Sequence, residues 1–390
     1  MDETPYVETT STSWFQRLQQ SVAGVGMGIV LLLGMVWLLW WNEGRAVQTA
    51  RSLAEGSGAV VSVAANTVTP GNQGKLVHVS GPVAVEGTRT DPVFGISTQG
   101  IALERRVEMY QWVEHTETSK RKTLGGGEET VTTYTYRLEW RDRPVDSGRF
   151  KRPGGHSNPQ MVYRGERFVA PRGTLGAFEL DRGLLSRIGG AEPFRVPAEV
   201  EQRLAGMAGV RQPAKVLDGG IFLGANPQSP SVGDYRITFS AVPVGPVSVV
   251  ARQTGKSFAG YQTKAGDVLF MVRRGEVPAS QMFADAVKAN NFITWIVRAV
   301  GLIGLFVAFS MVLGVFGVVA DVIPFLGSIV RMGTGFAAFI LAVAVGTVTI
   351  GLAWLYFRPL IGIAILAIGV GVTVWGAMRG RQAAPAPARV

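Results

Sequence analysis

Residues 332–357 read MGTGFAAFILAVAVGTVTIGLAWLYF, and residues 359–378 read PLIGIAILAIGVGVTVWGAM. Each segment has about the 20 apolar residues with which an α-helix crosses a bilayer, and neither contains an ionisable side chain. Arg358 and Pro359 stand between them. A charged side chain is costly at mid-bilayer, and proline suits the first turn of a helix. The pattern predicts two transmembrane helices joined by a tight turn at a membrane surface.

Two further apolar segments, residues 22–41 and 299–320, bring the prediction to four transmembrane helices. The first ends in a cluster of tryptophans, as membrane–water boundaries favour. A cleaved signal peptide is the alternative for residues 22–41, but their apolar core is long and no clean small-residue cleavage site follows it. We expect residues 1–21 to form a polar tail with a short interfacial helix, and residues 379–390 to form a disordered tail.

Residues 42–295 have ordinary polarity and are long enough to bury a core. Short alternating or β-branched runs bounded by Pro and Gly predict an extramembrane α+β domain dominated by antiparallel strands. The clearest pattern is a hairpin with arms at residues 105–123 and 128–143, joined by the glycines at 125–127. The glycines do not indicate a phosphate loop, because no Lys-Ser/Thr follows them.

The chain has 390 residues, a formal net charge of +10 and no cysteine. Without cysteine there are neither disulfides nor thiolate metal sites. In a membrane protein, positive charge is explained by anionic head groups, and no nucleic-acid-binding motif accompanies it. We therefore expect membrane lipids, and not nucleic acid, as partners.

Motifs for catalysis are missing from the sequence. The histidines are His78, His115 and His156, and none has metal-ligand spacing. There is no G-x-S-x-G nucleophile motif. The four predicted spans also lack the internal ionisable groups that pumps and transporters use. The sequence predicts a non-enzyme with no cofactor and no metal.

Small residues at four-residue spacing let helices approach closely in lipid. Such spacing serves contacts within one chain as well as self-association, so both interpretations stay open. The candidate packing residues are Gly24, Gly28, Gly304, Ala308, Ala338, Ala342, Gly346, Ala367 and Gly371.

Several motifs in order resemble the transmembrane protein 43 (LUMA) family. They include N-E-G-R-A at residues 42–46, R-x-V-E-M-Y-Q-W-V-E at 105–114, G-H-x-N-P at 155–159, T-K-x-G-D at 263–267 and W-L-x-x-R-P-L at 354–360. The family-motif and candidate interface residues are Asn42, Glu43, Gly44, Arg45, Glu108, Tyr110, Trp112, Trp140, His156, Asp234, Arg252, Asp267, Arg298, Arg358 and Pro359.

The resemblance implies a membrane organiser that self-associates, with no family catalytic residues to carry over. The composition is typical of a bacterial chain, so the expected location is a bacterial inner membrane. Four spans place both termini on one side, and the arginines near them favour the cytoplasm. Residues 42–295 would then be non-cytoplasmic. The expected function is a scaffold acting with lipids, further copies of itself and other membrane proteins.

A membrane-anchored lipid- or ligand-binding domain is the alternative function. It is suggested by aromatic and arginine side chains on the predicted hairpin, which could equally form the core of the domain. These residues are Arg105, Tyr110, Trp112, Tyr134, Tyr136, Trp140 and Arg141.

Overall fold

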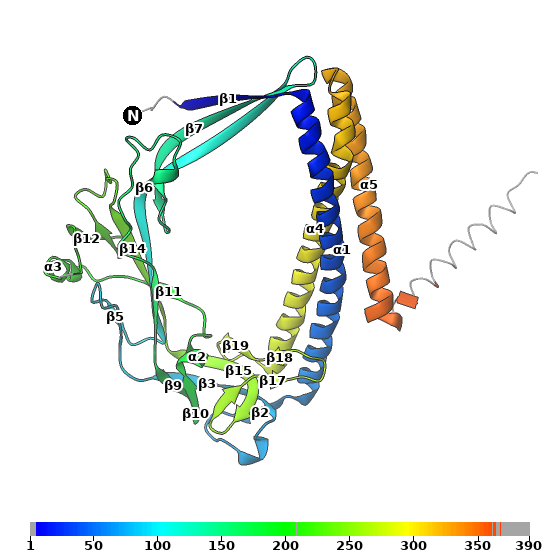
Figure 1. Ribbon diagram of the computed structural model, residues 1–390. Helices are drawn as coiled ribbons and strands as arrows, with labels where there is room; N and C mark the ends of the chain where they lie inside the picture. Colours follow the sequence, from blue (N-terminus) through cyan, green and yellow to red (C-terminus); the bar gives the residue numbers. More distant parts are fainter. Residues whose placement is uncertain (1–4, 208, 361, 364–366, 368–390) are drawn as a thin grey trace, which may run out of the picture. The chain divides into compact units, whose positions relative to one another are not determined.

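The computed structural model describes residues 5–207, 209–360, 362–363 and 367. The chain forms two compact units. The first contains Ser52–Lys120, Thr130–Asp285 and the N-terminal residues through Thr10, and it holds the β-sheets. The second contains Ser11–Arg51, Arg121–Glu129 and the chain from Ala286 onward, and it holds most of the long helices (Figure 1).

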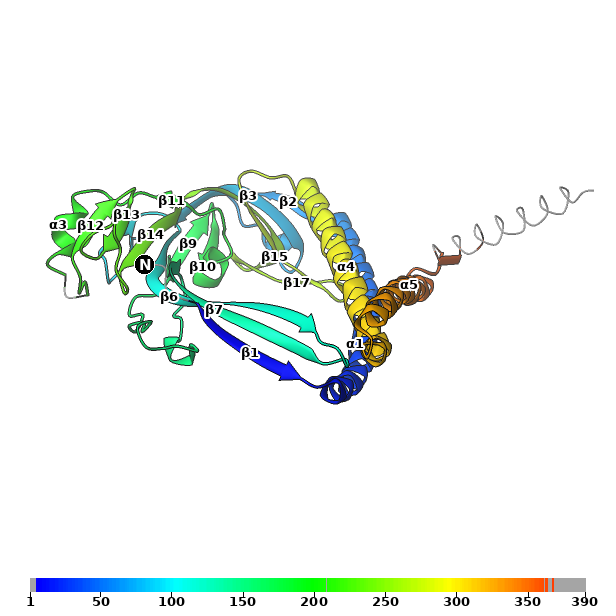
Figure 2. The ribbon, with the colours of Figure 1, turned by 90° about the horizontal axis from the view of Figure 1, so that it is seen from above.

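The larger sheet is built around a long hairpin. Its strand order is β1 (Tyr6–Thr12), β7 (Glu128–Arg141), β6 (Ala102–Lys122), β14 (Tyr235–Val242), β13 (Gly220–Leu223) and β12 (Ala214–Leu217). β8 (Glu166–Val169) also pairs with β6, and β11 (Glu192–Phe194) with β14. Buried residues alternate along β6, where Leu103, Val107 and Met109 enter a core shared with β14. The hairpin predicted from the sequence is confirmed, and β1 lies beside β7 (Figure 2).

A second sheet has its own core, in which Phe178 stacks on Phe258. The strand order is β10 (Phe178–Asp181), β9 (Arg172–Leu175), β3 (Leu76–Val85), β15 (Gly245–Thr254) and β16 (Ser257–Ala259). β19 (Met271–Arg274) pairs with β15, and β2 (Val61–Ala64) runs parallel to β3. Smaller elements are β4 (Arg89–Thr90), β5 (Ser97–Thr98), β17 (Tyr261–Gln262), β18 (Val268–Leu269), α2 (Arg182–Leu185), α3 (Val200–Leu204), η1 (Pro70–Asn72) and η2 (Ser147–Arg149).

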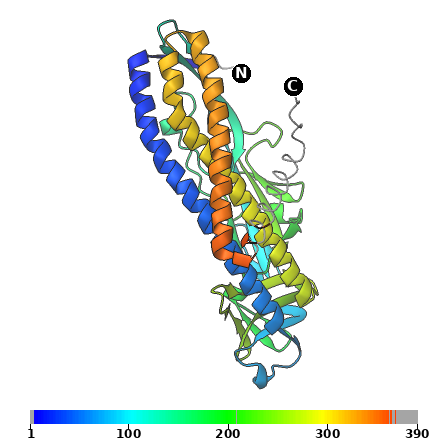
Figure 3. The same cartoon turned by 90° about the vertical axis from the view of Figure 1, so that its right-hand side faces the viewer.

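Three long helices are α1 (Trp14–Ala59), α4 (Ala279–Ala320) and α5 (Pro324–Phe357). Each contains a window long and apolar enough to cross a membrane. Their central segments run side by side (Figure 3) and share a small core of Leu39, Leu305 and Ala342. Large apolar side chains elsewhere on these helices are exposed, as lipid-facing surfaces require.

The structure bears on the sequence prediction in three respects. Three of the four predicted membrane helices are found as candidates among the described residues, and the fourth, predicted at residues 359–378, lies mostly outside them. Residues 6–12 form β1, whereas a polar tail was expected, because their β-branched and aromatic residues pair with β7. The first and second helices also extend well beyond the apolar segments at residues 22–41 and 299–320.

Candidate functional site

A buried carboxylate joins all three long helices at one end of their apolar segments. Glu43 of α1 is 0% exposed and accepts hydrogen bonds from Arg298 of α4, with Nε at 2.7 Å and Nη2 at 2.8 Å. The indole Nε1 of Trp354 on α5 donates to the same carboxylate at 2.8 Å. The Arg298 guanidinium also lies over the rings of Trp295 and Trp354. A charge out of water is tolerated when it is paired and fully hydrogen-bonded, as Glu43 is.

The neighbouring guanidinium of Arg45 is held by neutral groups. It donates to Asn290 Oδ1 at 3.0 Å, Asn42 Oδ1 at 3.2 Å and Thr294 Oγ1 at 3.0 Å. Asn42 in turn donates to the carbonyl of Thr294. The motif residues Asn42 and Arg45 therefore form a second polar contact between α1 and α4, next in sequence to the Glu43 contact.

Close packing explains the glycine of the same motif. A Cβ on Gly44 would lie 2.7 Å from Cζ of Phe357 on α5. Phe357 also contacts the ring of Trp40, at 5.6 Å between centroids. α5 ends at Phe357, and Arg358 has non-helical backbone angles before Pro359. The helix break predicted at Arg358–Pro359 therefore lies beside the Glu43 network.

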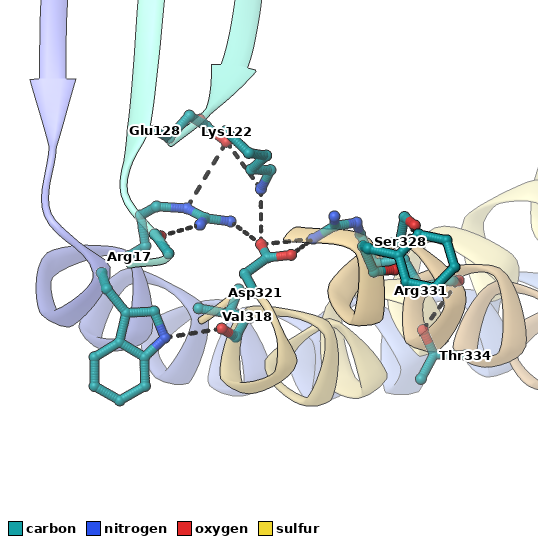
Figure 4. Close-up of polar contacts among 11 residues, drawn as sticks. Arg17, Lys122, Glu128, Val318, Asp321, Ser328, Arg331 and Thr334 are labelled. Atoms are coloured by element: carbon teal, nitrogen blue, oxygen red, sulfur yellow. Dashed lines mark hydrogen bonds and ion pairs between the residues drawn. The ribbon is translucent and has the colours of Figure 1, made fainter. Parts of the chain in front are cut away.

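A second charged network, missed in the sequence, lies in the turn between α4 and α5 (Figure 4). The Asp321 side chain is 0% exposed and accepts from Arg17 Nη2 at 2.6 Å, Lys122 Nζ at 2.9 Å and Arg331 Nη1 at 2.5 Å. Glu128 of the hairpin lies 3.1 Å from Lys122 Nζ and 3.7 Å from Arg17 Nε. Burial raises the pKa of Asp321, but these three cations outweigh it and lower the pKa to about 2.

The tip of the β6–β7 hairpin, residues 121–129, is fixed at this second network. Arg17 donates to the carbonyl of Gly126, and Trp14 Nε1 donates to the carbonyl of Val318 at 2.9 Å. Gly126 has φ +80°, and a Cβ there would lie 2.4 Å from Cδ1 of Trp14. Gly126 of the glycine connection is thus a packing position, which the sequence alone does not reveal.

In the first unit, motif residues on β6 contact motif residues in the loop that follows β7. The Asn158 side chain accepts from the backbone N–H of Trp112 at 2.7 Å and donates to its carbonyl at 2.9 Å, so it continues the strand's pairing. His156 is stacked on Tyr136 at 4.0 Å and meets Trp112 edge-on at 4.8 Å. These motifs have a structural role.

The remaining aromatic and charged candidates are spread over the sheet. Tyr110 packs on Trp140 at 5.0 Å between ring centroids, and Arg236 lies over the Trp140 ring while facing Glu108 at 3.4 Å. Asp234 is buried and accepts from the N–H of Ser231. Four of the hairpin aromatics therefore fall into two clusters, one around Trp140 and one around His156, while Tyr134 packs beside Tyr6.

Two candidates lie in the smaller sheet region. Arg252 is exposed on β15. Asp267 closes a turn in which its carbonyl accepts from Thr263 Oγ1 at 2.7 Å, and Oγ of Ser52 on α1 is hydrogen-bonded to the same hydroxyl at 2.9 Å. The T-K-x-G-D motif thus anchors the end of α1 to the β17–β18 turn.

Most of the small-residue positions serve packing within the chain. Added Cβ atoms would meet Ala308 and Val312 from Gly28, Met35 from Gly304, and Leu302 from Gly346. The alanines of the set on α4 and α5 are also buried, namely Ala308, Ala338 and Ala342. Gly24 has open space, Ala367 is exposed, and Gly371 lies outside the described residues.

The described residues contain no group of three or more His, Asp or Glu placed to hold a metal ion. A surface groove of about 610 Å³ runs along β3, β9 and β10, with Glu86, Arg172 and Asp181 among its lining residues. Asp181 accepts from the N–H of Leu184 and caps α2. In the part of the chain that is described, buried charge serves to fix elements to one another.

These features define a membrane protein in which apolar helices, joined by charged networks at their ends, accompany a large antiparallel-β domain. The sequence profile described as transmembrane protein 43 matches residues 109–359. Transmembrane protein 43 of Rattus norvegicus is 33% identical over 371 residues, covering 91% of this chain and 90% of the relative. The chain belongs to the transmembrane protein 43 family.

More distant animals also have relatives of similar length. Transmembrane protein 43 of Homo sapiens is 32% identical over 379 residues, covering 93% of this chain and 92% of the relative. The transmembrane protein 43 homolog of Drosophila melanogaster is 30% identical over 361 residues, covering 89% and 92%. No solved structure matches the chain significantly.

Proposed function

We propose that this protein is a non-enzymatic membrane scaffold that self-associates and organises a membrane region or envelope protein assemblies. Its partners are membrane lipids, further copies of the chain and other membrane proteins. In this proposal the protein resides in a bacterial inner membrane, with both termini cytoplasmic and residues 42–295 on the other side.

The observation that carries the proposal is the contrast between the inside and the outside of the helix bundle. Inside, Glu43 and Arg298 are committed to holding the helices together. Outside, large apolar side chains are left for lipid or for another protein. On α1 the stacked pair Trp37 and Trp41 is 65% and 47% exposed. A fixed bundle with an apolar exterior suits lateral assembly better than movement of ions or chemistry.

The experiment is to count copies in lipid. Full-length protein reconstituted into nanodiscs of several diameters would be analysed by native mass spectrometry and single-molecule photobleaching. We expect more than one copy per large disc at lipid-to-protein ratios where random co-occupancy predicts one. A strict monomer at every ratio would contradict self-association.

A second candidate function is binding of a lipid or other ligand by the β-domain. The groove along β3, β9 and β10 favours it, because its rim combines the cation Arg172 with acidic side chains. Binding of labelled lipids or polar ligands to the full-length protein should then weaken on Arg172→Gln. Unchanged binding would place the ligand elsewhere.

A further inference from the structure

The edge of β7 is covered by the N-terminal strand of the same chain. β1 lies next to β7 in the sheet (Figure 2), and Tyr134 of β7 donates to Glu8 Oε2 at 3.2 Å. Glu8 also pairs with Lys151 at 2.9 Å, and Tyr6 lies 5.9 Å from the Tyr134 ring. Most of β1 remains exposed, including Val7 at 52%. β1 is therefore a short edge strand that covers β7 through few side-chain contacts.

The pairing of β1 with β7 is incompatible with a membrane crossing by α1. β1 directly precedes α1 and β2 directly follows it, so a crossing at residues 22–41 puts the two strands on opposite faces of the bilayer. β2 is paired with β3 in the unit that contains most of β7. Between β2 and β7, residues 65–127 contain no candidate membrane helix. β1 can therefore cover β7 only when α1 does not cross.

Membrane insertion of the helices is more favourable than the pairing of β1 with β7. Exposed side chains such as Val30, Leu33 and Phe336 must leave water, and their burial in lipid involves all three helices. β1 contributes one short and mostly exposed strand. The tip of the β6–β7 hairpin must also separate from Arg17 and Asp321, because a crossing by the helices puts these residues on the membrane face opposite to β2 and β3. Asp321 then keeps Arg17 and Arg331, which are both carried by helices.

Release of β1 exposes the edge of β7, which is suited to pairing with β7 of a second copy of the chain. β7 reads EETVTTYTYRLEWR, a sequence rich in β-branched and aromatic residues with high strand propensity. An unpaired edge of this length is a template for another strand. In an antiparallel pair of two copies centred on Thr133, Glu129 of each copy faces Arg137 of the other. Such a pairing is isologous and closes as a dimer.

We propose that, in the membrane, β7 pairs with β7 of a second copy of this chain at the edge that β1 otherwise covers. This proposal rests on the proposed self-association and names its surface. One interface of this kind per β-domain gives dimers, and contacts between the membrane helices can link dimers into a larger assembly.

The test uses the absence of cysteine from the chain, which makes single-cysteine variants specific. In sealed proteoliposomes, Thr133→Cys should form a disulfide-linked dimer on mild oxidation. Leu217→Cys, on the opposite edge strand β12 and 43% exposed, is the matched control and should remain monomeric. Equal cross-linking of the two variants would overturn the proposal, because it would reflect random collision.

Charge exchange tests the register. Glu129→Arg or Arg137→Glu in the Thr133→Cys background should lower the cross-linked fraction at least threefold. The double exchange should restore it, because each pair then has opposite charges again. Since both single variants keep the strand, restoration separates lost pairing from misfolding. If the single variants lower the cross-linked fraction and the double exchange does not restore it, both the proposed register and the proposed dimer are wrong.

Labelling from each face of the membrane tests whether β1 and β2 lie on opposite sides. An impermeant maleimide should modify Val7→Cys and Val61→Cys from opposite faces of the vesicle. Modification of both from one face would show that β1 stays on β7, and it would overturn the inference. If nanodiscs hold several copies but Thr133→Cys does not cross-link, self-association stands and this surface is wrong. If the protein is monomeric, both proposals fail.

Discussion

Removing Arg298 should destabilise the helix bundle more than removing the carboxylate it binds. In Arg298→Gln, Glu43 stays at 0% exposure with the Trp354 indole as its donor, while two charge-assisted hydrogen bonds are lost. Leaving a buried charge without its partner costs about 3–5 kcal/mol. We expect a loss of that size in the free energy of unfolding.

The carboxylate substitution should be milder. In Glu43→Gln the amide oxygen still accepts from Trp354, and the Arg298 side chain, 12% exposed, can turn toward head groups or water. Lost hydrogen bonds to charged groups predict about 1.5–3 kcal/mol. The double variant should be close to Glu43→Gln alone, because no buried charge is left unpaired. The expected coupling energy then equals the cost of Arg298→Gln alone, about 3–5 kcal/mol.

Denaturant unfolding in mixed micelles, followed by tryptophan fluorescence, measures these differences. Arg51→Gln is the matched control, since Arg51 is exposed and donates to the Phe357 carbonyl, and it should change stability by less than about 0.5 kcal/mol. If the effects of Glu43→Gln and Arg298→Gln simply add within about 0.5 kcal/mol, the two residues are not coupled. The assignment of this network as the joint of the three helices would then be wrong.

Three further outcomes are expected. Because the folded pKa of Asp321 is lowered from 3.8 to about 2, its contribution is complete above pH 4 and is lost as pH falls through 2. Asp321→Asn should abolish about 2 kcal/mol of acid-dependent stability in pH-dependent unfolding. Gly126→Ala should release the hairpin tip in detergent by raising its protease cleavage, whereas Gly125→Ala, with similar φ and open space, should do so less. Gly28→Leu should separate α1 from α4 and lower the melting temperature by several degrees, while Gly24→Leu should not.

The sequence predicted what depends on periodicity and composition. Long apolar segments indicated the membrane helices, and alternation along residues 128–143 indicated an antiparallel arm, since both are local properties. The antiparallel-β domain is confirmed, as are three of the four predicted membrane helices as candidates. α1 runs past the predicted span at residues 22–41 as far as Ala59, although Gly56 and Gly58 favour a helix end. Gly56 is instead packed against Leu269 and Phe283.

The candidate sites were only partly predictable. Asn42, Glu43, Arg45 and Arg298 were selected by motif, yet nothing in the sequence placed Glu43 on Arg298 rather than at a surface. The network around Asp321 was not predicted. Two of its cations, Arg17 and Lys122, come from distant parts of the chain, and such contacts have no local pattern.

The spacing of the two networks gives them a common physical explanation. Arg17 and Glu43 are 26 residues apart on α1, and Arg298 and Asp321 are 23 apart on α4 and its turn. At 1.5 Å per residue these separations are about 39 and 35 Å. They exceed the hydrocarbon core of about 30 Å and lie within the bilayer thickness of about 40–45 Å. Helices that cross with modest tilt therefore place the Glu43–Arg298 pair in one head-group region and the helix-borne residues Arg17, Asp321 and Arg331 in the other. Charge there can hold helices together without being moved through lipid, which explains why the apolar interiors need no ionisable group.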